Sequence, residues 1–403
     1  MDVLVLEWLN LACRWFHVLA AIAWIGASFY FIWLDLSLRE PPQWKQDKGI
    51  KGDLWAIHGG GIYEIEKYNL RPEVMPKKLH WFKWEAYSTW LSGSGLLILM
   101  YYFQAQSYLV GYNTWIQSPL MAIVASILFI AVAQLIYESL IRTPLVKKGM
   151  AFALVLLFLI TFGSWLAHHL FSARAAYLHV GAMMATWMAG NVFWGIMPTQ
   201  RKFVAAVSAN QEPDVNAAAL AKLRSTHNNY LTVPVIFCMI SNHYSFLYGH
   251  QYGWIALIVI GACLAWGRHF FNLKHRGILR PGILVSSAMG LILTATVLSL
   301  TATSAQSSAG QATTAGVEGT AAEQQAALQS LITTHCSNCH SANPTQAGFN
   351  APPAGLIIDD LDHLKIVKVR AIPALTSGYM PLGNFNHMTE DERKLMIGWM
   401  NQM

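Results

Sequence analysis

Long apolar runs constrain this chain more than any other feature of its sequence. A helix needs about 20 apolar residues to cross the hydrocarbon core of a bilayer. Eight segments approach or exceed this length: residues 6–34, 84–103, 120–140, 151–170, 175–197, 230–248, 253–271 and 283–300. Hydrophobic residues make up 54% of the chain and charged residues only 12%, whereas soluble domains carry charge on about a quarter of their residues. The sequence therefore predicts an all-α fold with eight membrane-spanning helices.

The positive charges between these segments predict the orientation. Lys and Arg gather in the connections after the first, third, fifth and seventh segments, whereas residues 104–119 contain neither and residues 171–174 contain only Arg174. Basic loops stay in the cytoplasm, so we expect both ends of the chain on the outer side of the membrane. The net charge of +6 then reflects the basic residues of the loops expected in the cytoplasm. The expected partner of this surface is the lipid bilayer, and nucleic-acid binding is not predicted.

Beyond residue 300 the sequence changes to that of a small soluble domain. Residues 301–321 are rich in Ala, Thr, Ser, Gly and Gln, a composition typical of flexible linkers. A helix is predicted over residues 322–334, and a last helix over 390–400, where Thr389 and Glu392 form a capping box. Three regions follow: a membrane domain at 1–300, a linker at 301–321 and a soluble domain at 322–403.

A C-x-x-C-H motif indicates the chemistry of the soluble domain. Cys336 and Cys339 have the spacing of thiols that add to the vinyl groups of a haem, and His340 then binds the iron. A redox-active C-x-x-C pair would need a thioredoxin-like strand and helix, and a zinc site would need a second pair, whereas the other three cysteines fall in the apolar segments. The motif therefore predicts one covalently bound haem c and a class I-like cytochrome c domain.

A methionine supplies the expected sixth ligand of this haem. Met380 lies about 40 residues beyond the motif and precedes Pro381, as is typical of cytochromes with His and Met ligands. Met388 directly precedes the capping residue and is expected to pack. Haem attachment of this type takes place outside the bacterial cytoplasm, in agreement with the charge pattern. We therefore expect a multi-pass protein of the bacterial inner membrane with its N-terminus and cytochrome domain in the periplasm.

Two histidines near the outer ends of the first and fifth segments suggest a second cofactor. His17 follows Arg14 and His179 follows Arg174 in similar surroundings, which favours a 4+4 parallel repeat of helices. Ionisable residues inside a membrane are usually functional. A haem b between His17 and His179 is one hypothesis, with His243 as a further candidate ligand. The alternative is that each histidine hydrogen-bonds a neighbouring helix.

A second polar group is predicted at the cytoplasmic face. Aromatic rings there could stack on a flat heterocycle, and amide and imidazole groups could bind its edges. The alternative is a helix-capping cluster at the membrane interface, where Trp and Tyr are enriched. The residues of this group are His80, Trp84 and Glu85 before and in the second segment, and Thr226, His227, Asn228 and Asn229 before the sixth.

Three sequence runs, at residues 17–31, 75–85 and 227–244, are distinctive. They resemble the bacterial integral-membrane urate oxidase (urate hydroxylase) family, whose members often end in a cytochrome c domain. The resemblance covers essentially the whole chain. It implies oxidation of urate to 5-hydroxyisourate, with electrons passed to the haem c instead of directly to dioxygen, and then to an acceptor such as a soluble cytochrome c or a terminal oxidase.

The implied reaction needs a general base, and His80, Glu85 and His227 are the candidates. Two other classes of protein remain open. A quinol-oxidising or other cytochrome b/c electron-transfer module would have no organic substrate of its own beyond quinol. A transporter or receptor with a cytochrome as redox sensor is disfavoured, because the two halves lack matching Gly/Pro-interrupted segments.

Overall fold

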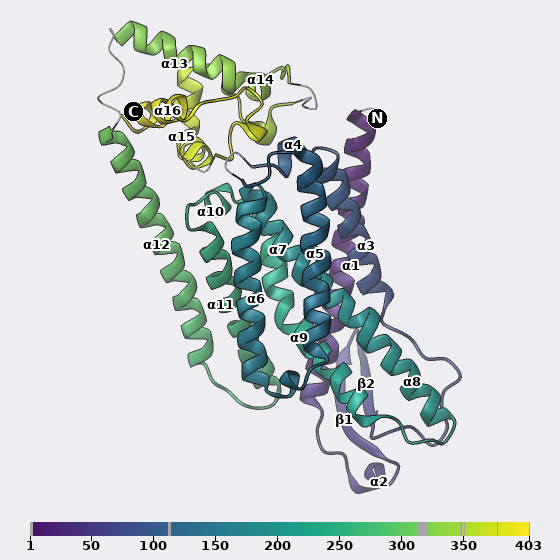
Figure 1. Ribbon diagram of the computed structural model, residues 1–403. Coiled ribbons are helices and arrows are strands. Elements are labelled where there is room, and N and C mark those ends of the chain that lie inside the picture. The colour runs from purple at the N-terminus through teal and green to yellow at the C-terminus, as the bar shows by residue number, and fades with distance from the viewer. Residues whose placement is uncertain are drawn as a thin grey trace.

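The apolar runs fold into long helices that lie side by side in one bundle (Figure 1). This computed structural model describes residues 3–111, 114–312, 321–346, 349, 351–376 and 378–402. The helices of the bundle and its flanks are α1 (Val3–Ser37), α3 (Trp84–Leu97), α5 (Pro119–Ile141), α6 (Gly149–Leu170), α7 (Ala173–Gly190), α8 (Met197–Ser208), α9 (Val215–Ile240), α11 (Gly253–His275) and α12 (Gly282–Ala312). Five short helices of the described residues complete it, namely α2 (Gln43–Gln46), α4 (Ala105–Tyr108), η2 (Pro144–Lys147), η4 (Ser241–His243) and α10 (Ser245–Tyr248).

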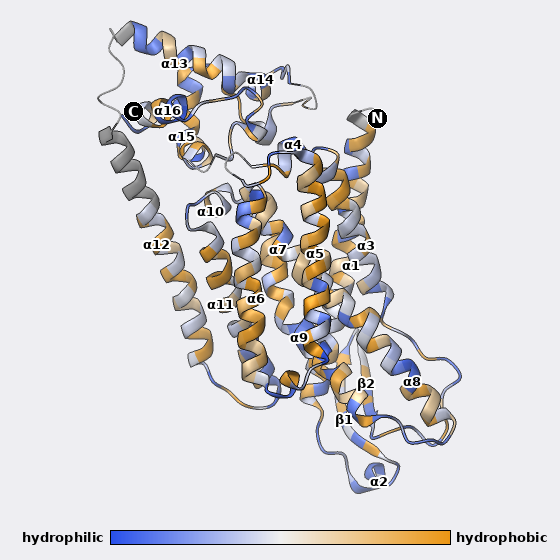
Figure 2. Cartoon of the chain, viewed as in Figure 1, coloured by the Kyte–Doolittle hydropathy of each residue, from blue (hydrophilic) through white to orange (hydrophobic). Residues whose placement is uncertain are grey.

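Five of the helices in the described part of the chain are long and apolar enough to cross a membrane. They are Val5–Ser37, Pro119–Ile141, Gly149–Leu170, Gly253–His275 and Gly282–Thr301. Much of their length is apolar, as the orange segments of Figure 2 show, and apolar side chains are exposed on them, for example Leu120 at 70% and Leu293 at 64%. Such large apolar surfaces are costly in water and suit a lipid environment. The other three predicted spans coincide with α3, α7 and α9, and eight spans remain a prediction, as does the 4+4 repeat.

Two of the helices continue into π-helical turns. Segment η1 (Ile98–Tyr102) extends α3, and η3 (Asn191–Ile196) extends α7 into α8. A π turn widens the helix and occurs frequently at functional sites. In η3 the fully buried Asn191 is the first residue of the turn.

A β-hairpin at the end of the bundle opposite the chain termini corrects the all-α prediction (Figure 1). Strands β1 (Ile50–His58) and β2 (Gly61–Tyr68) pair antiparallel. Gly59 and Gly60 join them with φ of 57° and 80°, which are the positive angles that a tight two-residue hairpin turn requires. Lys45 is buried against this hairpin, with its Nζ 2.8 Å from Asp53 and within reach of two glutamates of β2.

The C-terminal residues form a separate helical unit with its own core. Its elements are α13 (Ala321–His335), α14 (Ser337–His340), η6 (Pro353–Gly355), α15 (Leu361–Thr376), η7 (Leu382–Asn384) and α16 (Glu390–Gln402). The predicted first and last helices are confirmed. The capping box is present, because Thr389 N donates to Glu392 Oε2 at 2.7 Å and Glu392 N donates back to Thr389 Oγ1 at 3.3 Å.

The linker prediction needs one correction. Helix α12 continues to Ala312, so the chain does not leave its helix at residue 301, and residues 313–320 lie outside the described part. The C-terminal unit packs at the same end of the bundle as the N-terminus (Figure 1), where α16 contacts α12 and η7 contacts α4. Tyr379 packs against the apolar core of the bundle, with its ring 5.3 Å from that of Tyr248.

Helices α7 and α9 approach closely at Gly181, which yields the first prediction. A Cβ at this position would lie 2.6 Å from the Cβ of Cys238, so Gly181→Ala is expected to destabilise the fold by about 1–3 kcal/mol through overpacking. Gly26→Ala is the matched control, since a Cβ at Gly26 meets nothing within 4 Å. Thermal unfolding of both variants in detergent measures the difference, and equal melting temperatures would contradict the described packing.

Candidate functional site

Helix α9 separates residues that the sequence had grouped together. Thr226, His227, Asn228 and Asn229, which precede the sixth apolar segment, all lie within α9, because this helix begins at Val215. Successive helical residues point about 100° apart. Asn228 and Asn229 are both buried, but they face different neighbours and belong to two different polar clusters.

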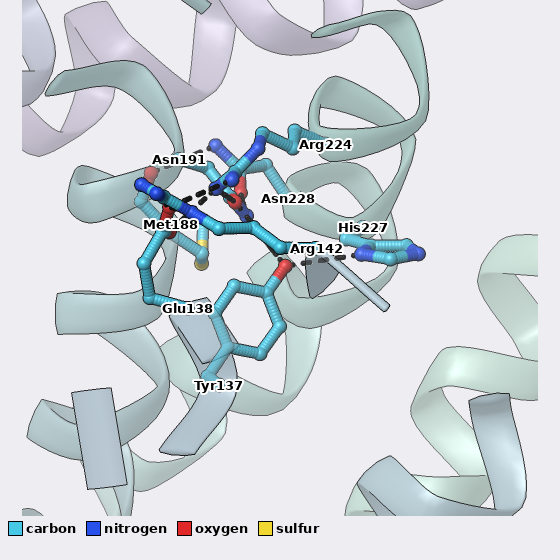
Figure 3. Close-up of polar contacts among 8 residues, drawn as sticks. All are labelled: Tyr137, Glu138, Arg142, Met188, Asn191, Arg224, His227 and Asn228. Carbon is cyan, nitrogen blue, oxygen red and sulfur yellow. Dashed lines mark hydrogen bonds and ion pairs between the residues drawn. The ribbon is translucent and has the colours of Figure 1, made fainter. Parts of the chain in front are cut away.

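The first cluster joins α5, α7 and α9 (Figure 3). The amide of Asn191 donates to Tyr137 OH at 2.8 Å and to Asn228 Oδ1 at 2.9 Å. Asn228 in turn donates to the Met188 carbonyl at 3.0 Å. Tyr137 OH lies 3.0 Å from His227 Nδ1, so a hydrogen-bonded chain runs from the π turn to the imidazole.

An ion pair closes this cluster (Figure 3). Arg224 donates to both carboxylate oxygens of Glu138, at 2.7 and 2.9 Å, and to Asn191 Oδ1 at 3.0 Å. Arg142 binds the same carboxylate from the surface at 2.7 Å. The bidentate geometry and low exposure of Arg224 make this a strong, charge-compensated contact.

Aromatic stacking fixes the rings of the first cluster. The Tyr137 ring stacks on Trp187 with centroids 5.1 Å apart, and His227 stacks on Phe152, also at 5.1 Å. A neutral imidazole hydrogen-bonded to a phenol can accept and release a proton. The chemistry available to this cluster is therefore proton transfer at His227, whereas Asn228 is engaged in hydrogen bonds to Asn191 and Met188.

The second cluster joins α9 and α11. Asn229 Oδ1 accepts from Arg268 Nε at 3.2 Å and from Asn272 Nδ2 at 2.9 Å. The guanidinium carbon of Arg268 lies 3.8 Å from the ring centroid of Phe29 on α1. Sequence reasoning missed Arg268 and Asn272, although their spacing of four residues on an apolar helix places them on one face.

The remaining predicted residues of the inner face are dispersed. His80 is exposed and packs edge-on against Phe82, with centroids 4.5 Å apart. Trp84 is 64% exposed. Thr226 donates only to Lys222 O of its own helix among the hydrogen bonds of the described residues. Glu85, in the first turn of α3, has a buried Oε2 with no hydrogen-bond partner in the described part of the chain.

The histidines proposed for haem b have protein partners. His17 Nδ1 lies 3.0 Å from both Thr89 O and Ser92 Oγ of α3. Both ring nitrogens of His179 are engaged, with Ser126 Oγ at 2.6 Å and Ala175 O at 2.7 Å.

Helix α3 packs against both α1 and α7, and the His179 ring is fully buried against Phe171 at 4.3 Å. The residues therefore do not fit a haem held between His17 and His179. His243 is exposed at the end of α9.

The C-x-x-C-H residues have an arrangement that fits a haem ligand. His340 Nδ1 lies 3.0 Å from the carbonyl of Leu356, a hydrogen bond that directs the lone pair to Nε2, as is usual for metal-binding histidines. Cys336 and Met380 pack against the same apolar cluster of this unit. Cys336 and Cys339 form no disulfide bond in the described part of the chain.

The burial of these side chains shifts their ionisation. Burial lowers the pKa of His340 below its usual range, so the imidazole is neutral near pH 7, as a metal ligand must be. Burial raises the pKa of the Cys336 thiol to about 12. In the described part of the chain, no group of three or more His, Cys, Asp and Glu side chains comes together as a metal site, but a haem iron with one His and one Met needs no such group.

These features define a helical protein suited to a membrane, with buried polar clusters between its helices. A family model described as urate oxidase N-terminal matches residues 3–299, and the chain belongs to this family. Membership supports an oxidoreductase that acts on urate. No curated protein and no solved structure matches the chain.

The ion pair of the first cluster yields the second prediction. Glu138→Gln leaves the buried Arg224 without its carboxylate, which is expected to destabilise the protein by about 3–5 kcal/mol. Arg224→Gln should cost less, because Glu138 keeps its contact with Arg142. The double variant removes both charges, so its loss should be smaller than the sum of the two. Thermal unfolding of the four proteins forms a double-mutant cycle. Additive losses would show that Glu138 and Arg224 are not coupled.

Proposed function

We propose that this protein is a membrane-bound urate oxidase that passes electrons from urate to a haem c bound covalently by its C-terminal domain. The family match over residues 3–299 supports urate as the substrate. The observation that carries the electron route is the C-x-x-C-H motif with His340 held at Nδ1 by Leu356. The apolar outer faces of five long helices support the membrane location.

The proposed reaction balances without dioxygen as a reactant. Urate and one water give 5-hydroxyisourate, two electrons and two protons, and the water oxygen becomes the hydroxyl group on C5. A bound haem supplies one-electron redox chemistry, so the two electrons leave in sequence. They pass onward to an acceptor such as a soluble cytochrome c or a terminal oxidase.

Residues of this chain would prepare the haem site. Cys336 and Cys339 would hold the haem covalently, and His340 and Met380 would bind its iron. The buried Arg393 donates to the backbone carbonyls of Leu375 and Met380, which orients the loop that carries the methionine.

The two protons released by the reaction require acceptors within the protein. Among His80, Glu85 and His227, the geometry favours His227, because its ring is stacked on Phe152 and hydrogen-bonded to Tyr137. Tyr137 is also hydrogen-bonded to Asn191. When His227 takes up a proton at Nε2, this ordered chain of hydrogen bonds can stabilise the added charge. Glu85 has an unpartnered carboxylate oxygen and is the second candidate.

The proposed orientation follows the charge pattern of the loops. The N-terminus and the C-terminal unit lie at one end of the bundle, and the hairpin at the other (Figure 1). The hairpin belongs to the connection richest in Lys and Arg. We therefore place the hairpin in the cytoplasm of a bacterial cell and the haem domain on the outer face of its inner membrane.

Anaerobic mixing of the purified, oxidised protein with urate tests the proposed function. Loss of urate absorbance with reduction of the c-type band, at two electrons per urate, is the expected result. His340→Ala is the control, since it should remove the reducible band. If urate leaves the haem oxidised while a quinol reduces it, the proposal fails and an electron-transfer module takes its place.

The axial ligand yields a separate prediction. A thioether ligand raises the potential of a haem iron, so Met380→His is expected to lower the midpoint potential while the covalent haem is retained. Met388 packs in the apolar core at 1% exposure, and Met388→Leu should leave the potential near that of the unmodified protein. Redox potentiometry measures both. A drop in Met388→Leu alone would reassign the ligand to Met388.

A further inference from the structure

We infer that Asn229, Arg268 and Asn272 form the recognition site for a planar, anionic oxo-purine between α9 and α11. The inference rests on the proposed function and gives the substrate of that reaction its binding residues. It is carried by buried polar atoms that the protein leaves without partners.

The charge of Arg268 is the first observation. Arg268 is only 9% exposed, and its Nη2 atom is buried with no hydrogen-bond partner among the described residues. No Asp or Glu of the described residues lies within ion-pair distance of it. Arg224, which is similarly buried, has a bidentate glutamate. An uncompensated guanidinium inside a membrane bundle is costly and indicates an anionic ligand.

The two amides supply the second observation. Arg268 and Asn272 both donate to Asn229 Oδ1, which fixes the orientation of both amide groups. Asn229 Nδ2 and Asn272 Oδ1 are then left buried without partners. The cluster therefore offers two unpaired donors, Arg268 Nη2 and Asn229 Nδ2, and one unpaired acceptor.

This pattern selects the chemistry of the ligand. A urate anion carries carbonyl oxygens and ring N–H groups alternately along its edges, so one edge can accept from the two donors and donate to Asn272 Oδ1. When buried polar groups can be hydrogen-bonded only by a matching ligand, the site discriminates strongly against ligands that lack those groups. Phe29 holds the guanidinium in place by contact with its face, a cation–π arrangement that preorganises the charge.

The position of the cluster agrees with a cytoplasmic substrate. Arg268 and Asn272 lie in the last two turns of α11, at the end of the bundle that carries the hairpin. The next residues along each helix, Tyr230 and His269, are hydrogen-bonded at 2.6 Å. A tyrosine and a histidine, one from each helix, therefore lie next to the site.

Two variants test the assignment by equilibrium dialysis of labelled urate against the full-length haem protein, kept chemically reduced so that urate is not consumed. Arg268→Gln should weaken urate binding by roughly 10- to 100-fold, the range for a charged hydrogen bond. Arg276→Gln, which removes an exposed arginine at the end of the same helix, should leave the dissociation constant unchanged.

A third variant distinguishes loss of the binding site from misfolding of the protein. Asn272→Asp places a carboxylate beside Arg268, which should raise the melting temperature by compensating the buried charge and abolish urate binding. A higher melting temperature with urate binding retained, or unchanged binding in Arg268→Gln, would overturn the site. If the unmodified protein itself binds no urate, the proposed function fails together with the site.

Discussion

The pairing of Arg224 with Glu138 is the interaction on which the packing of α5, α7 and α9 around the first polar cluster depends. It joins α9 to α5 through two hydrogen bonds and reaches the π turn of α7 through Asn191. In a low-dielectric interior such a pair must be complete, because either charge alone would be unstable there. Asn191, which accepts from Arg224, donates to Tyr137, so the ion pair is continuous with the hydrogen-bonded chain that ends at His227.

The sequence predicted the parts of this structure that depend on local composition. Apolar length predicted the helices, and the capping box at Thr389 predicted the start of the last helix. The haem expected from the C-x-x-C-H spacing remains a prediction. The hairpin was missed, although Gly59-Gly60 between two alternating stretches is a recognised turn signal. It was missed because the surrounding residues were interpreted only as a charged loop.

The site was harder to predict because it depends on helix rotation and on distant partners. Asn228 and Asn229 are adjacent in sequence, but the rotation of α9 about its axis decides that Asn228 faces Asn191 and Asn229 faces Arg268. Leu356, which holds His340, lies outside the motif and has no sequence signal of its own. The π turn at Asn191 likewise arises from packing, since its residues are compatible with an ordinary helix.

The two ends of the bundle carry different halves of the proposed chemistry, and α11 connects them. Arg268 lies 15 residues from Gly253 at the start of the helix, which corresponds to about 22 Å along its axis. At the far end, Tyr379, the neighbour of Met380, packs against the bundle and lines a cavity of about 210 Å³ together with His168 and His169. The loop that carries Met380, the proposed haem ligand, therefore packs directly on the helical bundle. In the proposed reaction, urate recognition at Arg268 and haem ligation by His340 and Met380 lie at opposite ends, so the electrons would have to cross the bundle.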